Sequence, residues 1–139
     1  MEGVKTIKLD IITPDGQPYS GDVRFVLARA IDGDIGIYPN HAPMVVALDT
    51  DAFKYIDAEG ETHYLALFGC TLEVLDNQIT VLTRNCEEAV SIDKARALRA
   101  KERAEKRLAE KGNPDIDYER ASAALKRAMT RIRVVEFVK

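Results

Sequence analysis

The chain has 139 residues, of which 46% are hydrophobic and 31% charged, and its formal net charge is −3. This composition is typical of a globular protein, and no apolar run approaches the ~18 residues that a membrane helix needs. The first residues mix acidic and basic side chains and lack the apolar run of a secretory signal. We therefore expect a chain that stays in the compartment where it is made and does not insert into a membrane.

The first part of the chain predicts an antiparallel β-sandwich. It holds seven of the eight glycines and is divided by turn sequences such as Pro14-Asp15-Gly16, Ser20-Gly21-Asp22 and Glu59-Gly60-Glu61. Segment 5–11 alternates polar and apolar side chains, which is the pattern of a strand with one buried face. Many short strands with regular turns favour a sandwich or barrel. The expected strands are 6–12, 23–30, 36–38, 44–47, 52–57, 62–67, 71–75 and 78–83.

After Cys86 the composition changes, and the sequence predicts an antiparallel two-helix hairpin. Ala, Glu, Lys, Arg and Leu dominate, with no Gly or Pro before Gly112, and these residues favour a long helix. We expect Ser91 to be the N-cap, with Asp93 in the first turn, and we expect Gly112-Asn113-Pro114 to end this helix. A second helix is expected from about 117 to 135, folded back because the connecting loop is short.

Small residues recur at helical spacing where the two helices should face each other. Alanine buries much less apolar area than leucine does, so the seam should be weak. The position of the hairpin should then depend on the sandwich, on a ligand or on a partner. The residues expected at the seam are Ala97, Ala100, Ala104 and Leu108 on the first helix and Ala121, Ala124, Leu125, Ala128, Ile132 and Val135 on the second.

The charge of the chain divides at the same point as its composition. Residues 1–86 hold 6 Lys and Arg against 13 Asp and Glu, a net charge of −7, whereas residues 87–139 hold 14 against 10, a net charge of +4. We therefore predict two units with different partners: a β-sandwich domain over 1–86 and a helical hairpin regulatory domain over 87–139.

No arrangement of residues in the sequence predicts catalysis. Phosphate-binding loops, nucleophile elbows and HExxH motifs are missing from the sequence. Cys70 and Cys86 lack CxxC spacing, and His41 and His63 are the only histidines. We therefore predict no catalytic residues and no metal site. A small hydrolase is a less favoured alternative, because it would have to turn over substrate by itself.

Arginines on the hairpin are the clearest chemical feature of the sequence. Arg96 and Arg103 lie seven apart on the first helix, and Arg127 and Arg131 lie four apart on the second, so antiparallel pairing would bring them within reach of one anion. Guanidinium groups suit phosphate because they donate two parallel hydrogen bonds and keep their charge. Two other interpretations stay open: a solvated helix surface with ordinary ion pairs, and a nucleic-acid-binding module, against which the acidic sandwich argues.

Several segments match the sequence pattern of one protein family over essentially the whole chain. Residues 33–43, GDIGIYPNHAP, fit the pattern G-[ED]-[IL]-G-[IL]-x-P-x-H-A-P. Residues 68–74, FGCTLEV, and 77–82, NQITVL, fit G-G-x-L-E-V followed by N-x-[VI]-T-V-L, with Cys70 in place of the second glycine. Residues 92–97, IDKARA, match I-D-x-x-R-A without a gap. In these segments the chain resembles the epsilon subunit of bacterial F-type rotary ATP synthases.

The resemblance implies a non-catalytic rotor subunit of the central stalk that couples the catalytic head to the membrane ring of the proton-translocating enzyme. The implied partners are the gamma subunit, the membrane c-subunit ring and the alpha/beta head, at the cytoplasmic face of the cell membrane. Asp34 and His41 are expected on a loop that resembles the one meeting the ring and gamma. The hairpin is implied to rise along the shaft and block ATP hydrolysis. A weakly packed hairpin suits an element with two positions.

The resemblance also implies that ATP is a regulatory ligand held between the folded helices, and neither a substrate nor a required cofactor. The arginines would meet the phosphates, with Asp93 and Glu87 near the purine-bearing end. The sequence leaves the Mg²⁺ requirement open. The positions that match the nucleotide site of the family are Glu87, Ile92, Asp93, Arg96, Ala97, Arg103, Arg127 and Arg131.

Overall fold

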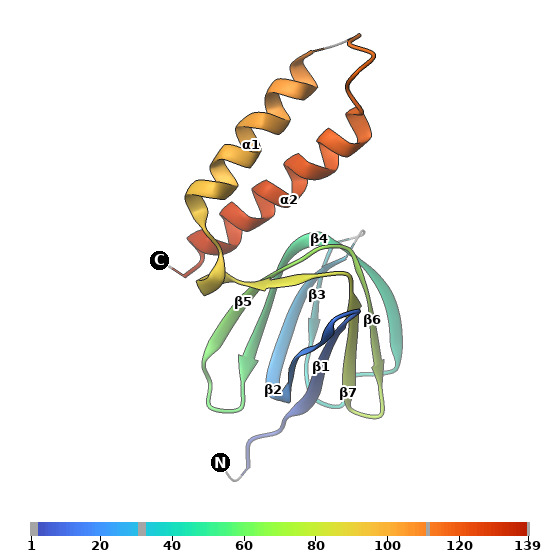
Figure 1. Cartoon of the computed structure of the whole chain (residues 1–139). Helices are drawn as coiled ribbons and strands as arrows, with labels where there is room; N and C mark the ends of the chain where they lie inside the picture. Colours follow the sequence, from blue (N-terminus) through green and yellow to red (C-terminus); the bar gives the residue numbers. More distant parts are fainter. Residues whose placement is uncertain (1–2, 31–32, 111, 139) are drawn as a thin grey trace.

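The computed structural model describes residues 3–30, 33–110 and 112–138, which form a β-sandwich followed by a two-helix hairpin (Figure 1). This confirms the predicted fold class. The strands are β1 (Ile7–Thr13), β2 (Gly16–Ala30), β3 (Gly33–Ile37), β4 (Met44–Asp57), β5 (Thr62–Leu67), β6 (Cys70–Leu75), β7 (Gln78–Thr83) and β8 (Cys86–Glu88). They are followed by the 3-10 helix η1 (Ala89–Ser91) and the helices α1 (Lys94–Ala109) and α2 (Tyr118–Glu136).

The strands close into a ring in which β2, β1, β7, β6 and β4 are each hydrogen-bonded to the next, and β4 returns to β2. Strand β3 extends the sheet from β2, while β5 and β8 extend it from β4. The pairing of β1 with β7 is parallel, whereas every other described pairing is antiparallel. The predicted antiparallel sandwich therefore has this parallel pair as an exception. A closed ring of five strands cannot alternate in direction all the way round, so one neighbouring pair must be parallel.

The alternation of polar and apolar residues in β1 buries one face of the strand, as predicted. Ile7, Leu9 and Ile11 point into the sandwich with no solvent exposure, and they pack in one core with Phe53 of β4 and Leu72 of β6. Complete burial of side chains of this size contributes about 1.5–3 kcal/mol each relative to leaving them exposed. The core of the sandwich is therefore much larger than any apolar contact made by the hairpin.

Two long strands replace shorter predicted ones. Segments 44–47 and 52–57 belong to the single strand β4, which pairs with β6 in its first half and with β5 in its second half. The turn expected around Gly21 lies inside β2. A Cβ at Gly21 would lie 2.6 Å from the Tyr19 hydroxyl, so this glycine leaves room for a side chain and does not form a turn.

The helical hairpin leaves the sandwich through β8 and η1. The edge strand β8 pairs with β5 and crosses the predicted domain boundary at residue 86, so the division there stays a prediction. Gly112 has φ of 80° between the helices, the left-handed conformation expected of a residue that ends a helix. In the described chain, neither helix combines the length and hydrophobicity of a membrane span.

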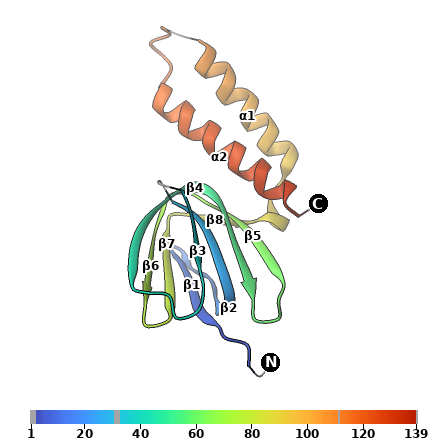
Figure 2. The ribbon, with the colours of Figure 1, turned by 180° about the vertical axis from the view of Figure 1, so that it is seen from behind.

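The helix seam is made largely of alanine, as predicted. Ala97, Ala104, Ala121 and Ala128 are each at most 3% exposed, whereas the larger seam residue Leu108 is only partly buried. Both views of the ribbon show the hairpin projecting from one end of the sandwich, with only the C-terminal part of α2 close to the strands (Figures 1 and 2). Most of the hairpin is therefore free of the sandwich.

Candidate functional site

A cavity of about 410 Å³ lies where the hairpin meets the sandwich. Its walls come from β8, from η1 and the residues after it, from the first half of α1 and from α2. It combines cationic, anionic and small apolar side chains. The lining residues are Glu87, Ser91, Ile92, Asp93, Arg96, Ala97, Ala100, Arg103 and Arg131.

The start of α1 fixes the cationic wall of the cavity. The Asp93 carboxylate accepts a hydrogen bond of 3.1 Å from the backbone N–H of Arg96, so Asp93 is the N-cap. The prediction that Ser91 caps this helix was wrong, because Ser91 belongs to η1. Starting the helix at this point puts Arg96 and Arg103, seven residues apart, on the same wall.

Arg131 of α2 lines the cavity as well and also joins the hairpin to the sandwich. Its Nε and Nη2 atoms donate to the two carboxylate oxygens of Glu87 over 2.8 and 3.0 Å. The guanidinium carbon also lies 4.8 Å from the centre of the Phe68 ring. The side chains of Arg131 and Glu87 are 27% and 29% exposed. This forked pair therefore connects α2 to β8 in a partly shielded place.

The other two arginines of the cavity differ from Arg131. Among the described residues, no carboxylate lies within 4.0 Å of the guanidinium of Arg96 or Arg103. A second, shallower hollow lies along α1 and shares the same two residues. It is lined by Arg96, Arg99, Glu102, Arg103 and Lys106. Guanidinium groups that no carboxylate contacts keep their donors available for an added anion, so this wall favours a bound anion.

The structure brings together seven of the eight residues predicted for a nucleotide site. The exception is Arg127, which is exposed on α2 and does not line the cavity. Ala100, four residues after Arg96, lines it as well, and helical spacing alone was sufficient to find this residue. Phe68, which lies under the Arg131 guanidinium, was missed because its contact spans more than sixty positions and leaves no local pattern.

Two further ion pairs and an apolar contact hold α2 on the sandwich. Lys126 Nζ lies 2.5 Å from Asp49 Oδ1, and Arg133 Nη1 lies 2.5 Å from Asp51 Oδ1. The hydrogen bond from Lys126 is the main cause that lowers the pKa of Asp49 below its ordinary value. Beside these pairs Val134 is fully buried in a small apolar cluster with Ala66, Phe68 and Ala89. The Phe137 ring at the end of α2 also lies 5.0 Å from the Tyr64 ring of β5, so docking combines ion pairs with small apolar contacts.

Asp34 and His41, predicted to share one loop, are separated by the length of β3. Asp34 lies within β3 and accepts a hydrogen bond of 3.1 Å from Arg29 of β2. His41 lies beyond the other end of the strand, where its Nδ1 is 2.8 Å from the carbonyl oxygen of Ala42. The prediction of a shared loop was wrong, because residues 33–37 pair with β2 as a strand. The segment that holds His41 lies beside the β6–β7 turn, since the Asn40 N–H donates to the Asn77 side chain.

Comparison with protein-family models gives two matches that together span nearly the whole chain. The model described as ATP synthase, Delta/Epsilon chain, beta-sandwich domain matches residues 6–89. The model described as ATP synthase, Delta/Epsilon chain, long alpha-helix domain matches residues 91–136.

Known proteins that are similar in sequence carry the name ATP synthase epsilon chain. The protein of Bacillus velezensis is 46% identical and that of Bacillus licheniformis 44% identical, each alignment covering 94% of this chain and 98% of the relative. The protein of Nitratidesulfovibrio vulgaris is 42% identical over 94% of this chain and 96% of its own length.

A chain from the cryo-EM structure of the Euglena gracilis mitochondrial ATP synthase, comprising OSCP, F1 and the c-ring, has a similar fold. Its TM-score is 0.81 over 94% of this chain and 82% of that chain. The identity is only 17%, so this likeness supports the fold and nothing finer.

Proposed function

The chain belongs to the ATP synthase delta/epsilon chain family, and we propose that it works as the epsilon subunit of the central stalk, without catalytic activity of its own. In this role it turns with the gamma subunit and couples the catalytic alpha/beta head to the membrane c-subunit ring. It is then a peripheral component at the cytoplasmic face of the cell membrane.

An exposed apolar strip on the sandwich supports the gamma partnership. Ile12 of β1 lies opposite Leu82 of β7, Leu82 lies opposite Thr71 of β6, and Thr71 lies opposite Ala47 of β4. Val45, two residues from Ala47, points to the same face and is 69% exposed, and Leu82 is 53% exposed. A row of apolar side chains along a sheet face is typical of a protein–protein contact. We propose this strip as the surface that packs on gamma.

The weak attachment of the hairpin supports its proposed role as a two-position inhibitor. Exposed ion pairs each contribute about 0–1 kcal/mol, and the apolar cluster at the interface contains only Val134 from α2 among its fully buried members. The docked and released forms then differ by only a few kcal/mol, a difference that a ligand or partner can reverse. In the released position the hairpin extends along the shaft and blocks ATP hydrolysis.

The residues that line the cavity support the proposal that ATP acts as a sensor ligand. Arg96 and Arg103 offer guanidinium groups without carboxylate partners among the described residues, so the phosphates belong on their wall. Glu87, held by Arg131, and Asp93 lie at the same cavity and are assigned to the purine-bearing end. A ligand that contacts both α1 and β8 stabilises the docked form by mass action, since the released form lacks half of the site.

Calorimetric titration of the full chain with ATP, with and without Mg²⁺, tests this assignment. Arg96→Ala removes one guanidinium from the phosphate wall and should weaken ATP binding at least ten-fold, which corresponds to ~1.4 kcal/mol. Arg120→Ala, an exposed position in the first turn of α2 outside the cavity, is the matched control, because it removes the same charge. Arg133 is less suitable as a control because it pairs with Asp51.

The outcome separates the proposed site from its alternatives. If millimolar ATP gives no heat of binding, or if Arg96→Ala and Arg120→Ala lose ATP affinity equally, the cavity is an ordinary solvated surface and no ATP site. Binding of an oligonucleotide at low salt with no preference for ATP would favour the nucleic-acid-binding alternative. Arg127→Ala tests the eighth predicted residue, and a loss equal to that of Arg96→Ala would add Arg127 to the site.

A further inference from the structure

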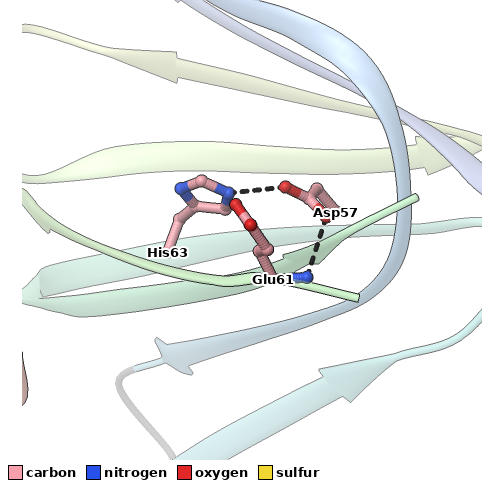
Figure 3. Close-up of side chains that lie close together, drawn as sticks. All are labelled: Asp57, Glu61 and His63. Carbon is pink, nitrogen blue, oxygen red and sulfur yellow. Dashed lines mark hydrogen bonds and ion pairs between the residues drawn. The ribbon is translucent and has the colours of Figure 1, made fainter. Parts of the chain in front are cut away.

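The turn between β4 and β5 gathers three potential metal ligands at the end of the sandwich that lies away from the hairpin (Figures 1 and 2). Asp57 ends β4, Glu61 follows the turn, and His63 lies in β5. One ligand atom from each residue lies within 4.8 Å of the other two. Figure 3 shows the three side chains converging on one side of the turn. No step of the proposed function uses them.

The Asp57 carboxylate is held in a fixed orientation by the backbone of the turn. Its Oδ1 accepts the N–H groups of Glu59 and Glu61 over 3.0 and 2.9 Å. Gly60, with φ of 88°, gives the turn the left-handed residue that it needs. The second oxygen, Oδ2, is thereby directed at His63. These backbone hydrogen bonds have the role that outer-shell hydrogen bonds play in metal sites, where they orient a ligand before the metal arrives.

The His63 ring is also held in place. It stacks on Tyr55, its partner across β4 and β5, with ring centres 4.7 Å apart and planes 18° apart. Its Nε2 lies 2.7 Å from Asp57 Oδ2. Tetrahedral ligands at the usual zinc distances of 2.0–2.1 Å lie about 3.3 Å apart, so the two atoms need to separate by only about 0.6 Å to admit an ion.

From this geometry we propose that Asp57, Glu61 and His63 bind one divalent transition-metal ion of the Zn²⁺ or Ni²⁺ class. An imidazole nitrogen with two carboxylate oxygens suits these ions, whereas Ca²⁺ takes six to eight oxygen ligands and Mg²⁺ keeps most of its water. The His63 side chain is 40% exposed, so solvent supplies the remaining ligand. The bound ion takes the place of the proton shared by Asp57 and His63 and ties the end of β4 to the start of β5.

Titration of the full chain with ZnCl₂ and with NiCl₂ in a non-chelating buffer tests the site, with heat and melting temperature as readouts. We expect one ion per chain and a rise in melting temperature as the ion is added. His63→Ala should abolish both effects. Glu61→Gln should weaken binding about ten-fold or more, the smallest loss usual when even an outer-shell partner is removed. His41→Ala is the matched control, because it removes the only other histidine, and it should leave binding within two-fold of the unaltered chain.

Several results would overturn the proposal. They are the absence of binding at millimolar ion, binding retained by His63→Ala, and equal losses from the two histidine changes. If His63→Ala does not fold, Glu61→Gln decides, since the Glu61 side chain is exposed and its loss leaves the turn hydrogen bonds in place. Unchanged binding in Glu61→Gln would then rule out the three-ligand site. The turn is remote from the ATP cavity, so either proposal can fail without the other.

Discussion

Separating Arg131 from Glu87 should release the hairpin from the sandwich without unfolding either part. Two hydrogen bonds of 2.8 and 3.0 Å join the side chains, and the Arg131 guanidinium also stacks over Phe68. Because both side chains are a little over one quarter exposed, their interaction lies between that of an exposed pair and that of a shielded one. Arg131→Ala removes the pair and the stacking contact together.

The loss of docking free energy expected for Arg131→Ala follows from these contacts. A partly shielded forked pair is worth about 1–2 kcal/mol, between the ~0.2–1 of exposed pairs and the ~1.5–3 of hydrogen bonds to charged groups. Stacking of the cation on the ring adds about 0.5–1 kcal/mol. Arg131→Ala should therefore reduce the free energy of docking by about 2 kcal/mol, which increases the released population about 30-fold when docking is favourable.

The NMR shifts of the Val134 methyl groups measure this opening, because the Val134 side chain is fully buried beside Phe68, Ala66 and Ala89 in the docked form. A double-mutant cycle with Glu87→Gln isolates the pair from the Phe68 contact, and Arg120→Ala serves as the charge-matched control. We expect a coupling energy of about 1 kcal/mol between Arg131 and Glu87. A coupling below about 0.3 kcal/mol, the usual error of additivity, would refute the idea that this pair holds the hairpin.

The other predictions concern the parts of the chain around this pair. A fragment ending at Glu88 keeps β8 on β5, so it should show one cooperative thermal transition and should raise ATP hydrolysis when assembled into the synthase in place of the full chain. A non-cooperative melt would refute the two-unit division, and unchanged hydrolysis would refute inhibition by the hairpin. Lys126→Ala should raise the pKa of Asp49 toward its ordinary value of 3.8, measured by NMR titration, because the Lys126 hydrogen bond is the main cause of its depression. Since the folded pKa lies below the unfolded one, this pair stabilises the docked form above pH 3.8 and loses that effect as the pH falls through the folded pKa. An unchanged pKa in Lys126→Ala would contradict the pairing.

The arginine cavity shows where prediction from the sequence succeeded and where it stopped. Helical spacing was enough to put Arg96 and Arg103 on one wall, because a helix repeats every 3.6 residues whatever surrounds it. The pairing of Arg131 with Glu87 was not predictable, although family resemblance named both residues. It depends on β8 adding to the edge of β5, a contact that no local pattern reveals.

The sequence by itself determined most of the strands, both helices, the alanine seam and the family, since these follow from side-chain periodicity, turn residues and motifs read along the chain. Only the tertiary structure decided the parallel pairing of β1 with β7, the separation of Asp34 from His41 by β3, and the joining of Arg131 to Glu87. The physical reason is the same in each case. Local propensity sets the conformation of a segment, whereas closure of the strand ring and the pairing of its edges set which distant residues become neighbours.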